Sequence, residues 1–110
     1  MYSKILYIHI ADLNSTTILT QEIEKETIPL LSFPKVDVLE NDQARGLRIS
    51  EIERAMRLGN GSKHKVKIVF EDAEGIKTVH TTVWGVTQNR IVLKRGDSIP
   101  VHRIHKITFY

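Results

Sequence analysis

The sequence predicts an α+β fold, mainly β: a small antiparallel five-stranded barrel that follows a short helix and carries an N-terminal extension. Two observations predict it. From His64 onward, apolar and polar residues alternate, and turn residues such as Asp72, Gly75 and Asn89 separate the short runs. A single amphipathic stretch precedes these runs. Strands of this length and spacing favour a barrel over a sandwich.

The length of 110 residues fits a single domain, 1–110. Within it we distinguish an N-terminal extension (1–46), a helix (47–60) and a barrel-like region (63–110).

The first part of the extension predicts a strand over 3–11, which is rich in Ile, Leu and Tyr, and a turn over 12–15. The next stretch, 16–27, is ambiguous. Its Thr-rich start suits a strand, whereas 21–26 contains good helix formers, and we favour a helix.

The second part of the extension contains two helix breakers, Pro29 and Pro34. Val36 and Val38 alternate with charged residues, which predicts an edge strand. The polar residues 41–46 indicate a linker.

The clearest helix signal lies between this linker and the glycines at 59–61. Ser50 and Glu53 have the spacing of a capping box, and the glycines suit a helix end. The helix could also begin earlier, near Asp42. An apolar stripe indicates the face that packs: Ile52, Ala55 and Met56.

The barrel-like region predicts five strands, over 64–70, 77–87, 90–94, 98–102 and 104–109. Gly85, in the middle of the second run, indicates a bulge or a sharp bend. We expect these side chains to be buried: Val66, Ile68, Phe70, Val83, Ile91, Leu93, Ile104 and Ile107.

The composition excludes several classes of protein. The chain has no cysteine, so thiol nucleophiles, disulfides and thiolate metal sites are excluded, and a reducing cytoplasm is the expected location. No apolar run approaches the ~20 residues that a membrane-spanning helix needs, and we expect no membrane partner.

Positive charge is concentrated in the second half of the chain. Residues 1–62 hold seven Lys or Arg and nine Asp or Glu, whereas residues 63–110 hold nine Lys or Arg and four Asp or Glu. Such an excess attracts phosphate groups, although a solvated surface is the plainer explanation. The candidate nucleic-acid-binding residues are Lys63, Lys65, Lys67, Arg90, Lys94, Arg95, His102, Arg103 and Lys106.

Catalytic and metal sites are not indicated. The histidines offer a weak metal-like grouping, but His102 and His105 would fall on opposite faces of a strand, and no third ligand is evident. The carboxylates Glu71, Asp72 and Glu74 sit in or beside a predicted turn, where they are normally solvated. We therefore expect no enzyme activity, no catalytic residue, no metal and no cofactor.

Two local stretches carry a resemblance to known families. Residues 90–94 followed by 99–104, after a helix and short strands, resemble the SH3/Sm-like fold of the Sm-like/Hfq family. The resemblance implies RNA binding, with His102 at the position of a family histidine, while Pro100 and Val101 stand where that family has Tyr and Lys. Residues 81–87 with 99–104 also resemble a set of short uncharacterised bacterial proteins, which implies no known activity.

The functional expectation is a cytoplasmic, non-enzymatic binding or self-assembly module. The strand over 3–11 is apolar, and pairing with a second copy would cover its edge, so a homo-oligomer is expected. The alternative is nucleic-acid (RNA) binding through the basic second half.

Overall fold

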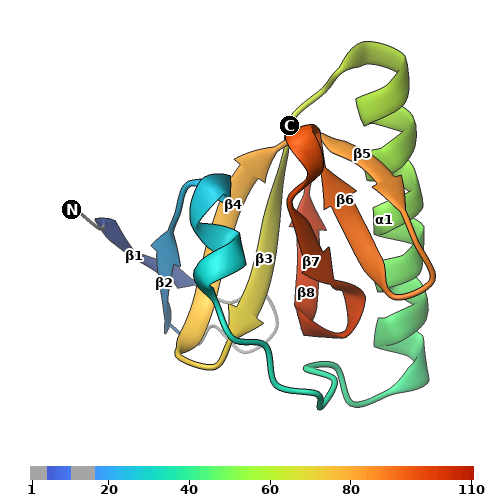
Figure 1. Ribbon diagram of the computed structural model, residues 1–110. Helices are drawn as coiled ribbons and strands as arrows, with labels where there is room; N and C mark the ends of the chain where they lie inside the picture. The colour runs from blue at the N-terminus through green and yellow to red at the C-terminus, as the bar shows by residue number, and fades with distance from the viewer. Residues whose placement is uncertain (1–4, 11–16) are drawn as a thin grey trace.

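The computed structural model describes residues 5–10 and 17–110 and shows one long helix with two β-sheets (Figure 1). The helix is α1 (Asp42–Ser62). The first sheet has five strands in the order β1-β2-β4-β3-β8. Their bounds are β1 Ile5–Ile10, β2 Thr17–Glu22, β3 Val66–Asp72, β4 Gly75–Thr81 and β8 Ile104–Thr108.

The second sheet has three strands in the order β5-β6-β7, with bounds Val83–Val86, Arg90–Leu93 and Ser98–Pro100. Three short 3-10 turns complete the fold: η1 (Lys25–Leu30), η2 (Lys94–Gly96) and η3 (Val101–Arg103). The first sheet is mixed, because β2 runs parallel to β4 while the other neighbours are antiparallel.

The prediction of a five-stranded SH3/Sm-like barrel is wrong. No strand pairing among the described residues joins one sheet to the other. The chain crosses between the sheets at Thr82, where the predicted strand over 77–87 breaks into β4 and β5, and again at η3. Both sheets are therefore open.

Helix α1 packs against one edge strand of each sheet, β5 and β8. On one side, Gly59 approaches the backbone of Val83 so closely that a Cβ atom there would lie 2.1 Å from the Val83 carbonyl oxygen. On the other side, Glu51 accepts a hydrogen bond of 2.9 Å from the Ile107 amide.

The core predictions for the second half are confirmed. The β3–β4 hairpin turns at Ala73 and Glu74, and burial alternates along β3 as a period of two requires. All eight core residues predicted from the sequence are at most 3% exposed. The structure adds five further core residues: Ile28, Ile52, Ala55, Val79 and Ile99.

The α-helix favoured over 16–27 is absent from the part of that range that the structure describes, 17–27. Thr17–Glu22 is β2, which pairs with β1 over six consecutive positions, and η1 follows it. The helix formers over 21–26 are overridden because β4 offers a partner strand: Gln21 and Glu22 pair with Lys77 and Thr78. The turn expected at 12–15 lies outside the described residues.

The helix is longer than the predicted 47–60: it spans Asp42–Ser62, which confirms the alternative start near Asp42, whereas the capping box at Ser50 is wrong. The N-cap is Asn41, whose side-chain oxygen accepts a hydrogen bond of 2.7 Å from the Ala44 amide. Ser50 lies inside the helix and donates to the Gly46 carbonyl. At the other end, Lys63 closes the helix in the left-handed conformation.

The segment 31–41 contains no strand, so the edge strand expected at Val36 and Val38 is wrong. Side chains and backbone from other elements hold this segment. Arg48 on α1 binds Asp37 through two hydrogen bonds of 2.8 and 2.9 Å, and the Val38 amide donates to the His102 carbonyl. The segment is fixed by contacts that no local sequence pattern encodes.

No helix among the described residues is both long enough and apolar enough to span a membrane.

Candidate functional site: a charged cleft and an open strand edge

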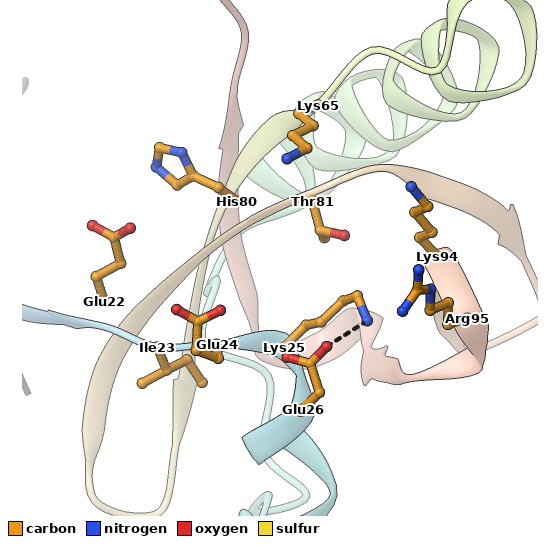
Figure 2. A pocket seen from close by; sticks show the side chains of 10 residues that line it. All are labelled: Glu22, Ile23, Glu24, Lys25, Glu26, Lys65, His80, Thr81, Lys94 and Arg95. Carbon is orange, nitrogen blue, oxygen red and sulfur yellow. Dashed lines mark hydrogen bonds and ion pairs between the residues drawn. The ribbon is translucent and has the colours of Figure 1, made fainter. Parts of the chain in front are cut away.

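A cleft of about 330 Å³ opens where four segments of the chain meet (Figure 2). These segments are the end of β2 with the start of η1, the residue before β3, the end of β4, and η2. The cleft therefore lies beside the place where the chain leaves the first sheet for the second. It is lined by Glu22, Ile23, Glu24, Lys25, Glu26, Lys65, His80, Thr81, Lys94 and Arg95.

Three of the predicted basic residues meet in this cleft: Lys65, Lys94 and Arg95. Lys65 directly precedes β3, and the η2 turn after β6 carries the other two (Figure 2). Among the described residues, the ammonium groups of Lys65 and Lys94 make no hydrogen bond or ion pair.

The acidic part of the lining comes from β2 and the residues after it. Glu22 and Glu24 lie on a different segment from Lys65, Lys94 and Arg95 (Figure 2). Glu26 is paired: its carboxylate lies 3.0 Å from the Lys25 ammonium, and this hydrogen bond lowers the pKa of Glu26. Lys25 also lies 3.6 Å from Asp97, which ties η1 to the turn before β7.

The end of β4 completes the lining with Thr81 and His80. Thr81 is 3% exposed. The His80 side chain is exposed, and its Nε2 lies 3.0 Å from the Tyr110 hydroxyl. Partial burial of Tyr110, and then the charge of Glu22, raise the pKa of this tyrosine.

Three other predicted basic residues donate hydrogen bonds to other parts of the protein. Arg103 is 4% exposed and donates to the carbonyls of Glu71 and Val36. His102 Nε2 donates to the Pro34 carbonyl at 2.9 Å. Arg90 Nε donates to the Ser98 hydroxyl at 2.8 Å.

The remaining three predicted residues lie outside the cleft. Lys63 is exposed at the end of α1. Lys67 is half-buried on β3, opposite His80 on β4, and Lys106 is exposed on β8. The nine residues predicted from the sequence therefore do not form one continuous basic surface.

The histidines of the second half make separate contacts. His105 Nε2 lies 2.8 Å from Glu71, whereas His80 lies beside Tyr110 and His102 binds Pro34. Across the described ranges, no group of three or more His, Asp or Glu residues is arranged to hold a metal ion.

The outer edge of β1 is the second candidate site. β1 ends the first sheet and pairs with β2 alone, in a ladder of six residue pairs without a register shift. Its sequence, ILYIHI, contains no Lys, Arg, Asp, Glu, Pro or Gly. Proteins commonly protect sheet edges with such residues or with bulges, so this edge carries none of the usual sequence protection.

The other three edge strands of the described residues are protected. β8 faces α1, where Glu51 satisfies the Ile107 amide. β5 is four residues long, lies against α1 and has a register shift between Val83 and Gly85, which confirms the predicted irregularity at this glycine. β7 has three residues and ends at Pro100.

Sequence reasoning missed the acidic lining, because Glu22 and Glu24 fall in the stretch assigned to a helix. The burial of Arg103 and Arg48 was missed as well, since a buried arginine has the same sequence signature as an exposed one. The edge strand itself was expected over 3–11, and the structure places it at Ile5–Ile10.

Comparison of the chain with protein-family models, with curated proteins and with solved structures gave no match.

Proposed function

We propose that this protein is a cytoplasmic, non-enzymatic module that assembles with a second copy of itself through the edge of β1. One observation carries the proposal. Among the four edge strands that the structure describes, β1 alone combines a regular six-residue ladder with an absence of Lys, Arg, Asp, Glu, Pro and Gly. An edge of this kind presents a row of unpaired N–H and C=O groups to another strand.

A second copy is the partner that fits this edge best. When β1 pairs antiparallel with β1 of another copy, a two-fold axis relates the two strands, and each supplies hydrogen-bond partners for the other. The first sheet of one copy then continues into the first sheet of the other. The interface needs no complementary charge, and β1 supplies none. Closed two-fold dimers are also the commonest homo-oligomers.

Nucleic-acid binding has less support. Arg103, His102 and Arg90 make hydrogen bonds within the fold. In the cleft, carboxylates lie beside Lys65, Lys94 and Arg95. A phosphate backbone would meet Glu22 and Glu24 there, and like charges repel it. Binding to RNA that falls steeply with salt would favour this alternative over assembly.

The experiment compares the wild type with Tyr7→Pro and Ile8→Pro by light scattering at micromolar concentration. Neighbouring residues of a strand direct their N–H groups to opposite edges, so one variant removes a donor to β2 and the other removes a donor to the open edge. Proline is tolerated at a strand edge where the N–H faces away from the partner.

We expect the wild type to have about twice the 12.6 kDa mass of one chain. The proline variant that loses the donor to the open edge should be monomeric with an unchanged melting temperature. The variant that loses the donor to β2 should have a lower melting temperature. Ile49→Lys, at a side chain that is 52% exposed on α1, is the control and should stay dimeric. A monomeric wild type, or a dimer that survives both prolines, contradicts the proposal.

A further inference from the structure

Two of the basic residues that line the cleft, Lys65 and Lys94, have no counter-charge among the described residues. Lys65 and Lys94 make no ion pair with the described residues, and Arg95 lies close enough to Glu26 to contribute to lowering the pKa of that carboxyl. Figure 2 shows the Lys65 side chain and the two side chains of η2 around the same opening. Converging cations that repel each other favour an anion between them.

The Thr81 hydroxyl lies in the same cleft and is open to it. Thr81 is 3% exposed, and its hydroxyl makes no hydrogen bond with the described residues. The side chain lines the cleft (Figure 2), so its hydroxyl can donate a hydrogen bond to an anion bound there.

The backbone of η2 is strained at the residue that reaches the cleft. Arg95 has φ 71° and ψ 13°, a left-handed conformation that costs a non-glycine residue energy. Gly96, the next residue, also has a positive φ of 98°. Strain that persists in a charged residue at the rim of a cleft is typical of binding sites.

The acidic lining restricts what kind of anion fits. Glu22 and Glu24 line the cleft from β2 and the residues that follow it, and neither carboxylate is held by an ion pair among the described residues. A polyanion would be repelled there, whereas a molecule with an amino group beside its anionic group would interact favourably with both sets of charges. The volume of about 330 Å³ suits a small molecule.

We propose that the cleft binds a small zwitterion, with its phosphate or carboxylate held by Lys65, Lys94, Arg95 and the Thr81 hydroxyl and its amino group facing Glu22 and Glu24. This site is separate from the β1 edge, and the proposal does not depend on assembly.

The test is an NMR titration of the full ¹⁵N-labelled chain with two probes, phosphoethanolamine and inorganic phosphate. Phosphoethanolamine should bind about tenfold more tightly, because its ammonium group gains a charge-assisted contact. The amide shifts should concentrate at Thr81, Lys94 and Arg95. The double variant Lys65→Gln/Lys94→Gln should weaken both probes by at least about tenfold.

Two further variants distinguish binding in the cleft from nonspecific attraction of the probes to positive charge. Lys35→Gln/Lys63→Gln removes the same charge from exposed positions outside the cleft and should leave both affinities unchanged. Glu24→Gln should remove the preference for phosphoethanolamine while phosphate binding persists. Each variant changes an exposed side chain, and circular dichroism would verify its fold.

Three results would overturn the proposal. The first is an absence of shifts at the cleft amides at probe concentrations of ~10 mM, above the range expected for weak binding. The second is an equal loss of affinity in the control double variant. The third is tighter binding of a short single-stranded RNA with shifts that extend over Lys67 and Lys106, which would assign the basic residues to nucleic acid.

Discussion

Arg48 and Asp37 form a bidentate ion pair that connects the segment before α1 to the helix. Arg48 Nη1 lies 2.9 Å from Asp37 Oδ1, and Nη2 lies 2.8 Å from Oδ2. The arginine is 5% exposed and also donates to the Ile104 carbonyl on β8. One guanidinium thus joins the helix, the segment 31–41 and the first sheet.

This pair predicts a loss of stability in acid. The Arg48 hydrogen bonds lower the pKa of Asp37 from 3.8 to about 2. Because the folded-state pKa is the lower one, the stabilisation is complete above the unfolded value and is lost as the pH falls through the folded one. Urea unfolding should show a loss of about 2 kcal/mol between these two pH values.

Asp37→Asn is the matched variant for the acid experiment. It should be less stable than the wild type at neutral pH, and its free energy of unfolding should change less with pH in the same window. If the wild type and Asp37→Asn follow parallel pH curves, the pair does not hold the segment as described.

Gly59→Ala should destabilise the protein, because a Cβ atom there would lie 2.1 Å from the Val83 carbonyl oxygen. Moving α1 away from β5 should cost about 1–3 kcal/mol. Gly61→Ala is the control, since nothing lies within 4 Å of its Cβ position and alanine favours the helix by roughly 0.5–1 kcal/mol. Thermal unfolding of both variants measures the difference, and equal melting temperatures would show that α1 does not approach β5 this closely.

Leu93→Ala should cost about 2–5 kcal/mol, because the side chain is fully buried between the two sheets and the helix. Leu30→Ala, at a side chain that is 84% exposed, should leave the free energy of unfolding within about 0.5 kcal/mol of the wild type. Denaturant titration distinguishes these outcomes. A negligible effect at Leu93 would place β6 in a different register.

Asp72→Asn should cost about 3–5 kcal/mol, because it leaves the buried Lys77 ammonium without its charge partner. The Lys77→Met variant should cost less, since Asp72 keeps hydrogen bonds from the Glu74 and Gly75 amides. The double variant should recover part of the loss of Asp72→Asn. A cost for Asp72→Asn no larger than that of a surface change would contradict the burial of this pair.

The strands of the second half could be predicted from the sequence because their signals are local. Alternation along β3 and the turn after Asp72 determine which side chains face the core, and Phe70 and Ile68 are buried as expected. The open sheets could not be predicted, since no local pattern marks the break at Thr82 between β4 and β5. Ser50 has the spacing of a helix cap, yet Asn41 fills that role nine residues before it, where no apolar stripe marks the start.

The charged cleft was only half predictable. Lys65, Lys94 and Arg95 were candidates because they are basic, but nothing local distinguishes them from Arg103, which is buried. In the structure their contacts differ: Lys65, Lys94 and Arg95 line the cleft, whereas Arg103 donates hydrogen bonds to backbone carbonyls. Glu22 was missed because its placement follows from the parallel pairing of β2 with β4, a contact between residues far apart in the chain.

Hydrogen exchange of the β1 amides tests the central claim, assembly through this edge, most directly. In the assembled protein every amide of Ile5–Ile10 should be protected, because alternate residues bond to β2 and the others bond to β1 of the second copy. Protection of alternate amides alone, with the others exchanging at the rate of an unstructured peptide, would show that the edge is unpaired and would contradict the proposal.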